Sequence, residues 1–504
     1  MSVAILYCRA SDSIEAPLVT IEVHIGGGLP ALSIVGLAET AVKESRDRVR
    51  SAVITSGFEF PQRRITVNLA PADLPKEGGR FDLGIALGVL IASGQVPGSR
   101  AAALEFAAEL ALTGRLRPVR GILPVAVAAA RDQHGLVVCQ DDAAQARLAP
   151  DAEIFAAQSL VDVVNHLTSK QPLRRVAGST AQREGINGPD LAEVRGHALA
   201  KRALEIAAAG GHNLLMVGPP GAGKSMLAAR LPGILPPLRQ AEAVETAMLE
   251  SLSGITLDPE RFFVRAFRAP HHNASSVALV GGGTHPRPGE ISLAHNGVLF
   301  LDELPEFDRR CLEALREPLE TGTVSIARAG YRARYPARFQ FVAAMNPCPC
   351  GHAGSKRHAC RCTPQQVQRY RHKISGPLLD RIDIQLFVGA IPIAELQGPD
   401  GAAEDTATVA SRVLQARQRQ QQRQACVNAQ LSGRALTQNC RTGPAEQALL
   451  AQAVERLGLS PRAYHRVLRV ARSIADVSGD DRLTGTHLRE ALAFRRLDLM
   501  AVAA

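Results

Sequence analysis

A glycine-rich segment between an apolar run and a helix-like run constrains the fold more than any other feature of this chain. Its residues are Gly218, Pro219, Pro220, Gly221, Ala222, Gly223, Lys224 and Ser225. Glycines let backbone N–H groups wrap a phosphate, and the positive end of the following helix faces the same anion. Lys224 then reaches the β- and γ-phosphates of a nucleotide, and the Ser225 hydroxyl binds Mg²⁺. An ordinary glycine-rich turn needs neither flanking element, so the segment predicts a nucleotide site in an α/β fold.

Two further apolar runs end in polar residues that such a site requires. The run 298–301 ends at Asp302 and Glu303. We expect Asp302 to hold Mg²⁺ and Glu303 to orient and polarise the attacking water. The run 339–344 leads to Asn346, which can hydrogen-bond that water and sense hydrolysis. Taken alone, the acids could equally be surface caps of a strand, and the asparagine would more often be a turn former, but the upstream loop favours the catalytic interpretation.

The chain of 504 residues is long enough for two to four domains. Residues 1–170 alternate apolar β-like runs with helical patterns, which predicts an α+β domain. Residues 171–188 are polar and glycine-containing, as expected of a linker. Residues 189–395 contain the nucleotide signatures. Residues 406–504 show almost no strand pattern and predict a helical C-terminal domain.

Charge and hydropathy bound the partners and the location. The net charge of +10 makes a polyanion a plausible partner, although a solvated basic surface would give the same value. The N-terminus lacks the basic start and apolar core of a secretory signal. No apolar run is long enough to span a bilayer. We therefore expect a cytoplasmic protein without a membrane partner.

Four of the nine cysteines lie close together in the sequence, at Cys348, Cys350, Cys360 and Cys362. The other five are scattered, unlike a secreted disulfide framework. Four thiolates can complete a tetrahedral Zn²⁺ shell and staple a loop that has no core of its own. Each pair has one intervening residue, tighter than the usual two to four, and His352 or His358 could replace a cysteine. A structural Zn²⁺ site and reduced thiols without metal both remain open.

Three longer segments carry a resemblance to a known family. They are Phe-Arg-Ala-Pro-His-His at 267–272, Gly-Glu-Ile-Ser-Leu-Ala-His-Asn-Gly at 289–297 and Ser-Gly-Pro-Leu-Leu-Asp-Arg-Ile-Asp at 375–383. With the strands described above, they resemble AAA+ ATPases of the magnesium-chelatase-like branch, and within it the ComM/YifB competence-related group. The similarity covers all three blocks, from residues 28–30 to residues 460–463.

This resemblance implies an AAA+ P-loop core, here with a Cys-rich insert at 348–362, followed by a C-terminal helical lid. It also implies a ring, usually hexameric, with ATP bound between subunits. Asn346 would be the first sensor, and Arg381 the finger directed at the neighbour's γ-phosphate, where a guanidinium suits the developing charge. Arg462 would be the second sensor in the lid, with Arg466 as the fallback one turn on. Without the family resemblance, a surface ion pair would be the favoured interpretation of Arg381 and of Arg462.

The N-terminal block resembles the Lon-protease-like fold. The stretch 75–79, Pro-Lys-Glu-Gly-Gly, matches the residues just before the protease's nucleophilic serine, but Arg80 occupies the serine position. The expected lysine is not found near 121–124. Without an activated hydroxyl and its general base, peptide hydrolysis is not supported. We expect this domain to bind or assemble rather than to cut.

A hairpin over 323–338 is the candidate nucleic-acid contact. It carries four arginines, Arg328, Arg332, Arg334 and Arg338. In the ring families that the chain resembles, a hairpin before the first sensor lines the central pore, and a row of arginines there could follow phosphates without reading sequence. The alternative is an edge hairpin protected by charge against aggregation. A second basic group, Arg412, Arg417, Arg419 and Arg423, is a weaker candidate and fits a solvated helix face better.

The first functional hypothesis is a DNA-translocating ATPase ring, by resemblance a branch-migration helicase that acts when incoming DNA recombines during natural transformation. The second is a protein-remodelling or metal-chelatase-type motor with a polypeptide client. The third is a nucleotide-dependent scaffold with negligible turnover, which the pairing of Asp302 with Glu303 disfavours. Stimulation of ATP hydrolysis by branched or single-stranded DNA distinguishes the first from the second.

Overall fold

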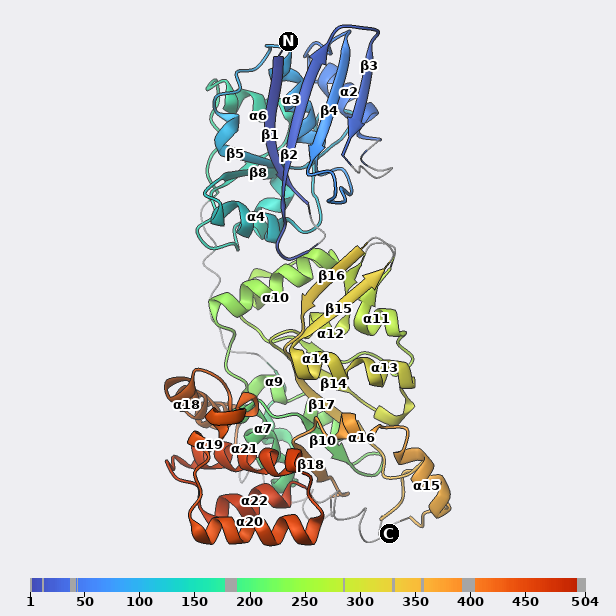
Figure 1. Cartoon of the computed structure of the whole chain (residues 1–504), viewed down its shortest axis with the longest axis vertical. Helices are drawn as coiled ribbons and strands as arrows, with labels where there is room; N and C mark the ends of the chain where they lie inside the picture. The colour runs from blue at the N-terminus through green and yellow to red at the C-terminus, as the bar shows by residue number, and fades with distance from the viewer. Residues whose placement is uncertain are drawn as a thin grey trace.

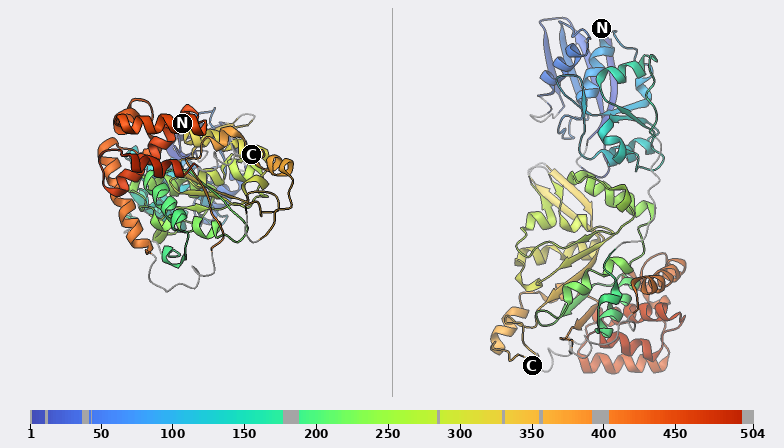
Figure 2. Two further views of the ribbon diagram at one scale, coloured as in Figure 1. Left: turned by 90° about the horizontal axis from the view of Figure 1, so that it is seen from below. Right: turned by 180° about the vertical axis from the view of Figure 1, so that it is seen from behind.

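The computed structural model describes residues 2–10, 13–36, 42, 44–176, 188–283, 286–328, 331–354, 358–391 and 404–495. The chain forms an elongated molecule with an N-terminal unit at one end, a central unit, and a C-terminal helical unit beside the central sheet at the other end (Figures 1 and 2). Most of the predicted linker 171–188, the glycine-containing break at 398–401 and the last nine residues of the predicted helical domain, 496–504, lie outside the described residues.

The N-terminal unit is built on a mixed seven-stranded sheet in the order β3-β4-β2-β1-β5-β8-β9. Its strands are β1 (Ser2–Arg9), β2 (Leu18–Gly26), β3 (Ala31–Val35), β4 (Arg64–Ala70), β5 (Leu104–Ala107), β8 (Gly135–Cys139) and β9 (Ile154–Ala157). In β2, Val19, Ile21, Val23 and Ile25 alternate with half-buried residues, so one face of this part of the sheet supplies the core. A small hairpin joins β6 (Glu109–Leu110) to β7 (Leu116–Arg117).

The helices of this unit pack against the sheet, and strands β5 and β8 are buried at every position. The helices are α2 (Ser45–Thr55), α3 (Asp82–Ala92), α4 (Ile122–Arg131), α5 (Ala143–Ala146) and α6 (Leu160–Leu167). Helix α3 is buried along nearly its whole length, which explains why its sequence is apolar on all sides. At the far edge, the N–H of Val176 donates to the carbonyl of Ile154 over 2.9 Å, so residues 174–176 extend the sheet beside β9.

The central unit contains a parallel five-stranded sheet in the order β11-β14-β17-β10-β18. Its strands are β10 (Leu214–Val217), β11 (Phe267–Arg268), β14 (Val298–Leu301), β17 (Gln340–Met345) and β18 (Ile384–Phe387). Strands β10, β14 and β17 are buried at every position, as expected for parallel strands covered on both faces. This sheet and the mainly helical C-terminal region confirm the predicted mixed α/β fold class.

Helices and two hairpins surround this sheet. The helices are α7 (Ala198–Gly210), α8 (Lys224–Ala228), α9 (Leu231–Ile234), α10 (Gln240–Ser253), α11 (Ser276–Val280), α12 (Glu290–Leu293), α13 (Arg309–Ala314), α14 (Arg316–Thr321), α15 (Pro364–Arg371) and α16 (Gly376–Leu379). One hairpin joins β12 (Gly281–Gly282) to β13 (Arg287–Pro288). The other joins β15 (Thr323–Arg328) to β16 (Tyr331–Pro336) and lies near α10, on the side of the N-terminal unit (Figure 1).

The C-terminal unit is helical throughout its described residues. Its helices are α18 (Thr406–Gln424), α19 (Gly433–Asn439), α20 (Pro444–Leu457), α21 (Pro461–Ser478) and α22 (Gly485–Ala493). Helix α21 is strongly amphipathic, and its buried stripe of Val467, Val470, Ala471 and Ile474 joins the core of α7 and β10.

The arginines of α18 bind groups within the chain, so the expected solvated basic face holds only in part: Arg419 and Arg423 are exposed, and Arg412 and Arg417 are half-buried. Arg417 donates twice to the carbonyl of Ala208 near the end of α7, over 2.9 and 2.6 Å. Burial lowers the pKa of Arg417 to about 9. The other three form ion pairs or carbonyl contacts: Arg412 with Glu205 and Glu404, Arg419 with the Asp476 carbonyl, and Arg423 with the Asp476 carboxylate. These residues hold α18 to its neighbouring helices.

Helix α10 joins the central unit to the N-terminal unit. Its apolar residues Ala243, Val244, Ala247 and Met248 belong to the same buried cluster as the N-terminal sheet. The N–H of Gly121, just before α4, donates to the carbonyl of Ser251 over 3.1 Å. The two units therefore share one hydrophobic core.

Among the described residues, no helix combines the length and the apolar character that a membrane crossing requires.

Candidate nucleotide site

The glycine-rich loop leaves β10 between two parallel neighbours. Val217, the last residue of β10, pairs with Met345 of β17 on one side and with Phe387 of β18 on the other. Gly218 then passes so close to the neighbouring chain that an added Cβ would lie 2.1 Å from the carbonyl oxygen of Val388. Only glycine fits at that point. The loop opens at the carboxyl ends of parallel strands, where α/β folds bind phosphates.

Lys224, the first residue of α8, points back into the loop. Its ammonium donates to the carbonyls of Gly218 and Pro219 over 2.8 and 3.0 Å and to Oδ1 of Asn346 over 3.3 Å. The side chain is buried, and this burial lowers the pKa of Lys224, although the charges of Asp302 and Glu303 oppose the shift. A desolvated ammonium in this position is well suited to bind an anion, because a phosphate oxygen would pair it more strongly than a carbonyl.

The two residues expected to hold Mg²⁺ lie in direct contact. The hydroxyl of Ser225 donates to Oδ2 of Asp302, at the end of β14, over 2.5 Å. Two ligands of an octahedral Mg²⁺ at about 2.1 Å stand about 3 Å apart. An outward movement of roughly 0.5 Å would therefore let both oxygens reach one ion. Both are hard oxygen donors, so the residues present fit Mg²⁺.

Glu303 follows in a left-handed backbone conformation with a φ of 53°. Such a conformation costs a non-glycine residue about 1 kcal/mol or more. The Glu303 N–H donates to Oδ1 of Asp302 over 2.9 Å, which stabilises the turn. The Glu303 side chain is 51% exposed and accessible to solvent beside the loop.

His272 is a site residue that the sequence reasoning did not assign. Its Nδ1 lies 3.2 Å from Oε2 of Glu303. His272 follows β11, which pairs in parallel with β14, the strand that leads to Glu303. The carboxyl ends of neighbouring parallel strands meet, and that pairing could have revealed the contact. The stretch 267–272 had contributed only to the family resemblance.

Asn346 stands at the carboxyl end of β17, directly beside the loop. Its side chain is half-buried and accepts from Lys224. Hydrogen bonds thus join Lys224 to Asn346 and Ser225 to Asp302, where the loop after β10 meets the ends of β14 and β17. This arrangement can bind a triphosphate. Glu303 directly follows Asp302, the acid at the end of β14.

Arg381 lies in the turn between α16 and β18. Its guanidinium donates to the carbonyl of Pro377 over 2.7 Å and pairs closely with Glu320 of α14. The carbonyl of Arg381 accepts from the side chain of Asn213, which precedes β10. The described contacts of Arg381 therefore involve α14 and the root of the loop strand, and none of them is with Lys224, Ser225 or Asp302.

The two candidate sensor arginines of the lid differ sharply in environment. Arg462 is exposed in the first turn of α21. Arg466 is buried, and its Nε lies 3.4 Å from Oδ1 of Asp383. Asp383 also contacts Nδ1 of His212 over 3.2 Å. Arg466 thus binds the C-terminal helical unit to the segment after Arg381, and of the two candidates Arg462 is the one exposed to solvent.

The hairpin arginines occupy three different situations. Arg334 is exposed in the middle of β16, opposite Ser325, and its guanidinium donates to Oγ1 of Thr323 over 3.3 Å. Arg338 is exposed beyond the base of the hairpin; the pKa of Glu245 is lowered mainly by its hydrogen bond with His295 and in smaller part by the charge of Arg338. The side chains of Arg328 and Arg332 lie outside the described part of the chain. The buried face of the hairpin is formed by Val324, Ile326, Ala333 and Tyr335.

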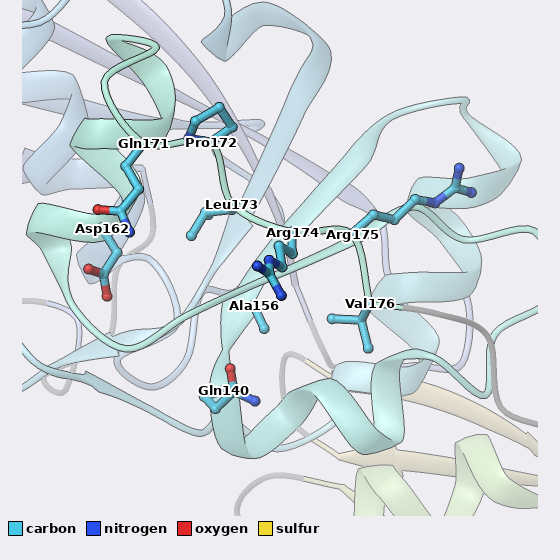
Figure 3. A pocket seen from close by; sticks show the side chains of 9 residues that line it. All are labelled: Gln140, Ala156, Asp162, Gln171, Pro172, Leu173, Arg174, Arg175 and Val176. Atoms are coloured by element: carbon cyan, nitrogen blue, oxygen red, sulfur yellow. The ribbon is translucent and has the colours of Figure 1, made fainter.

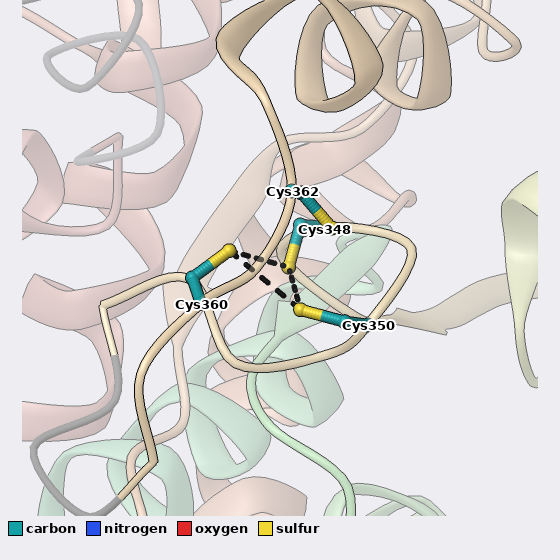
Figure 4. Close-up of side chains that lie close together, drawn as sticks. All are labelled: Cys348, Cys350, Cys360 and Cys362. Atoms are coloured by element: carbon teal, nitrogen blue, oxygen red, sulfur yellow. Dashed lines mark hydrogen bonds between the residues drawn. The ribbon is translucent and has the colours of Figure 1, made fainter.

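The four clustered cysteines come together in the structure. Their Sγ atoms all lie within 4.8 Å of one another (Figure 4). The four form the one group of potential metal ligands among the described residues, and neither His352 nor His358 belongs to it. The two histidine rings instead lie against each other, with their centroids 5.0 Å apart. The cluster fits a zinc site by ligand number and type.

The N-terminal unit contains a separate cavity of about 420 Å³. It is lined by Gln140, Ala156, Asp162 and the segment 171–176 (Figure 3).

Arg80, at the position of the serine expected in a Lon-like protease, is buried and donates to the carbonyl of Arg120 over 2.7 Å. A buried arginine held by a carbonyl offers no nucleophile for peptide hydrolysis.

Three family models match consecutive parts of the chain. "Subunit ChlI of Mg-chelatase" matches residues 21–142, "Magnesium chelatase, subunit ChlI" matches residues 190–396, and "Magnesium chelatase, subunit ChlI C-terminal" matches residues 403–495.

Several known proteins are similar to this chain over nearly its whole length. The competence protein ComM of Haemophilus influenzae is 50% identical over 501 residues, which cover 99% of this chain and 98% of that protein. The protein YifB of Salmonella typhimurium is 49% identical over 507 residues, covering 100% and 99%. YifB of Escherichia coli K12 is 47% identical over 502 residues, again covering 100% and 99%.

Proposed function

Because the chain belongs to the ComM/YifB family of magnesium-chelatase-like AAA+ ATPases, we propose that it is an ATP-hydrolysing ring motor that moves along DNA. The observation that carries the ATPase part is the convergence of Lys224, Ser225, Asp302 and Asn346 at the carboxyl ends of three parallel strands. A loop lysine, a magnesium-binding hydroxyl, an acid and a polar sensor are the groups that phosphoryl transfer needs.

Each of these residues has a role that its contacts support. The Lys224 ammonium exchanges its bonds to the Gly218 and Pro219 carbonyls for the β- and γ-phosphates. Ser225 and Asp302 hold Mg²⁺, which neutralises charge on the phosphates when bound. The Glu303 carboxylate orients the attacking water and accepts its proton. Asn346, already in contact with Lys224, reports the presence of the γ-phosphate to β17.

Hydrolysis in a ring requires a residue from the next subunit. We assign that role to Arg381, with Arg462 acting from the lid. The pair between Arg381 and Glu320 holds the guanidinium at the surface of α14 until a stronger anion replaces it. We propose a homo-oligomeric ring, most simply a hexamer, in which a neighbour's γ-phosphate is that anion.

DNA is the client we propose. The H. influenzae relative is named a competence protein, the chain carries a net charge of +10, and Arg334 is exposed on the hairpin beside α10. Aromatic residues make up 4% of the chain and Trp is absent, so contact with the phosphate backbone is favoured over base stacking. We propose branch migration of recombining DNA during natural transformation, with the N-terminal unit serving in assembly or binding.

The decisive experiment measures ATP turnover with and without branched or single-stranded DNA over a range of salt concentrations. We expect DNA to stimulate turnover and the stimulation to fade with salt. The match of residues 190–396 to a magnesium chelatase subunit favours a second candidate, a motor with a polypeptide client. Turnover that ignores DNA, together with stimulation by a protein client, would support that second candidate and contradict the first.

A further inference from the structure

The four cysteines have the spacing of zinc ligands and not of disulfides. Sγ of Cys348 lies 3.4 Å from Sγ of Cys350 and 3.6 Å from Sγ of Cys360, and the Cys350–Cys360 distance is 3.6 Å (Figure 4). A disulfide would require about 2.05 Å. A tetrahedral Zn²⁺ with Zn–S bonds of about 2.3 Å places its sulfurs about 3.8 Å apart. These three separations are within a few tenths of an ångström of that value, and Sγ of Cys362 lies within 4.8 Å of the other three.

The surroundings of the cluster resemble a built metal site. Cys348 is buried, and its sulfur accepts from the N–H of Ala353 over 3.2 Å. The N–H of Gly351 donates to the carbonyl of Cys348 over 2.9 Å and closes a tight turn between the first two ligands and the rest of the loop. A backbone donor such as the Ala353 N–H orients a thiolate and balances its charge.

The loop that carries the cluster touches the nucleotide site directly. Cys348 is two residues beyond Asn346. Gly351 approaches the phosphate-binding loop so closely that an added Cβ would lie 2.6 Å from Cδ of Pro220. Gly351 also has a φ of 81°, which disfavours any side chain.

The other end of the same loop leads to the predicted ring interface. Cys362 immediately precedes Thr363, whose side chain caps α15 by accepting from the N–H of Gln366. The chain then continues through α16 to Arg381. The cluster therefore stands between the sensor strand and the segment that presents the finger arginine.

We propose that Cys348, Cys350, Cys360 and Cys362 bind one structural Zn²⁺, and that the metal braces Pro220 and Asn346 for nucleotide binding. Binding releases the thiol protons and leaves four thiolates on the ion. The brace fixes the turn at Gly351 against the phosphate-binding loop and holds the start of the insert at the end of β17. The zinc site stands independently of the proposed function, whereas the brace rests on it.

The metal is tested on the full-length protein purified without chelator. We expect about one zinc per chain by elemental analysis, since one tetrahedral shell is available. The zinc content of the double variant Cys360→Ser plus Cys362→Ser should be at least tenfold lower than that of the wild type. Cys426→Ser, which changes a half-buried cysteine outside the cluster, should retain it. Metal-free wild type, or full zinc content in the double variant, would overturn the site.

The brace is tested by the binding of a fluorescent ATP analogue. We expect zinc-stripped wild type to bind the analogue at least tenfold more weakly and to recover when Zn²⁺ is added back. Gly351→Ala should keep its zinc and still weaken binding, because the new methyl group meets Pro220. Unchanged nucleotide affinity in both the stripped protein and Gly351→Ala would overturn the brace. If zinc-loaded wild type itself bound no nucleotide, the proposed function would fail while the zinc measurement stood.

Discussion

Nδ1 of His272 lies 3.2 Å from Oε2 of Glu303, the carboxylate to which we assign activation of the attacking water. The two residues follow neighbouring parallel strands and are separated by more than thirty positions in the sequence. We assign His272 a positioning role, because its ring contacts the carboxylate of Glu303.

Replacing the histidine should slow turnover without weakening nucleotide binding. We expect His272→Ala to lower kcat about tenfold, since a carboxylate displaced by up to 1 Å loses part of its advantage. Glu303→Gln should lower kcat by at least about 100-fold. His24→Ala, in the N-terminal sheet, is the matched control. Steady-state ATPase assays and analogue binding measure both quantities, and a His272→Ala variant with normal kcat would contradict the assignment.

Removal of the loop lysine tests the nucleotide site itself. Lys224→Ala deletes the buried ammonium that contacts Gly218, Pro219 and Asn346. We expect ATP turnover to fall by at least about 100-fold, because the phosphates lose their principal cationic partner. Lys170→Ala, at an exposed position of the N-terminal unit, should leave turnover unchanged. Wild-type turnover in Lys224→Ala would remove the basis of the motor proposal.

The hairpin arginine tests the DNA contact separately from hydrolysis. We expect Arg334→Ala to retain turnover in the absence of DNA and to lose part of the stimulation by DNA. The slope of the logarithm of DNA affinity against the logarithm of salt concentration should fall by about 1, the contribution of one phosphate contact. Arg441→Ala, an exposed position near α20, serves as the control. Equal slopes for the two variants would place the DNA elsewhere.

The buried carboxyl group of Asp142 predicts a pH dependence of stability. Burial raises the pKa of Asp142 to about 6, although the N–H of Val119 opposes the shift. The folded state therefore binds this proton more tightly than the unfolded state. The resulting stabilisation is complete below the unfolded pKa of about 3.9 and is lost as the pH rises through about 6.

Asp142→Asn should remove this dependence while keeping an oxygen that accepts from Val119. Between pH 4 and pH 7, the free energy of unfolding of the wild type should fall relative to the variant by up to roughly 3 kcal/mol. Urea unfolding over this pH range, followed in the N-terminal unit, gives the difference directly. Parallel stability curves would show that Asp142 titrates normally.

The local motifs of the nucleotide site were predictable from the sequence. The loop from Gly218 to Ser225 and the acids after 298–301 are contiguous, so their chemistry is visible without a fold. The strand pattern before each of them was equally local, and β10, β14 and β17 lie where apolar runs predicted them. The spacing of the four cysteines in the sequence indicated a possible metal site, but only the folded loop shows that their sulfurs lie close together.

Contacts between distant segments were not predictable in the same way. His272 meets Glu303 because β11 is placed beside β14, which the sequence does not state. Arg417 looked like part of a solvated face because its partner is a backbone carbonyl of α7, invisible to any charge pattern. Arg466 is buried against Asp383, a contact that its position one turn after Arg462 does not indicate. Such roles depend on packing and topology.

The shared core at α10 bears on how the protein can be shortened. A chain that began at residue 188 would turn Val244, Ala247 and Met248 from the interior toward water. Exposed apolar stripes of this kind drive association, so the isolated C-terminal two thirds should aggregate. We therefore expect the first 176 residues to be needed for the solubility of the remainder, so the protein is better studied by point substitution than by truncation.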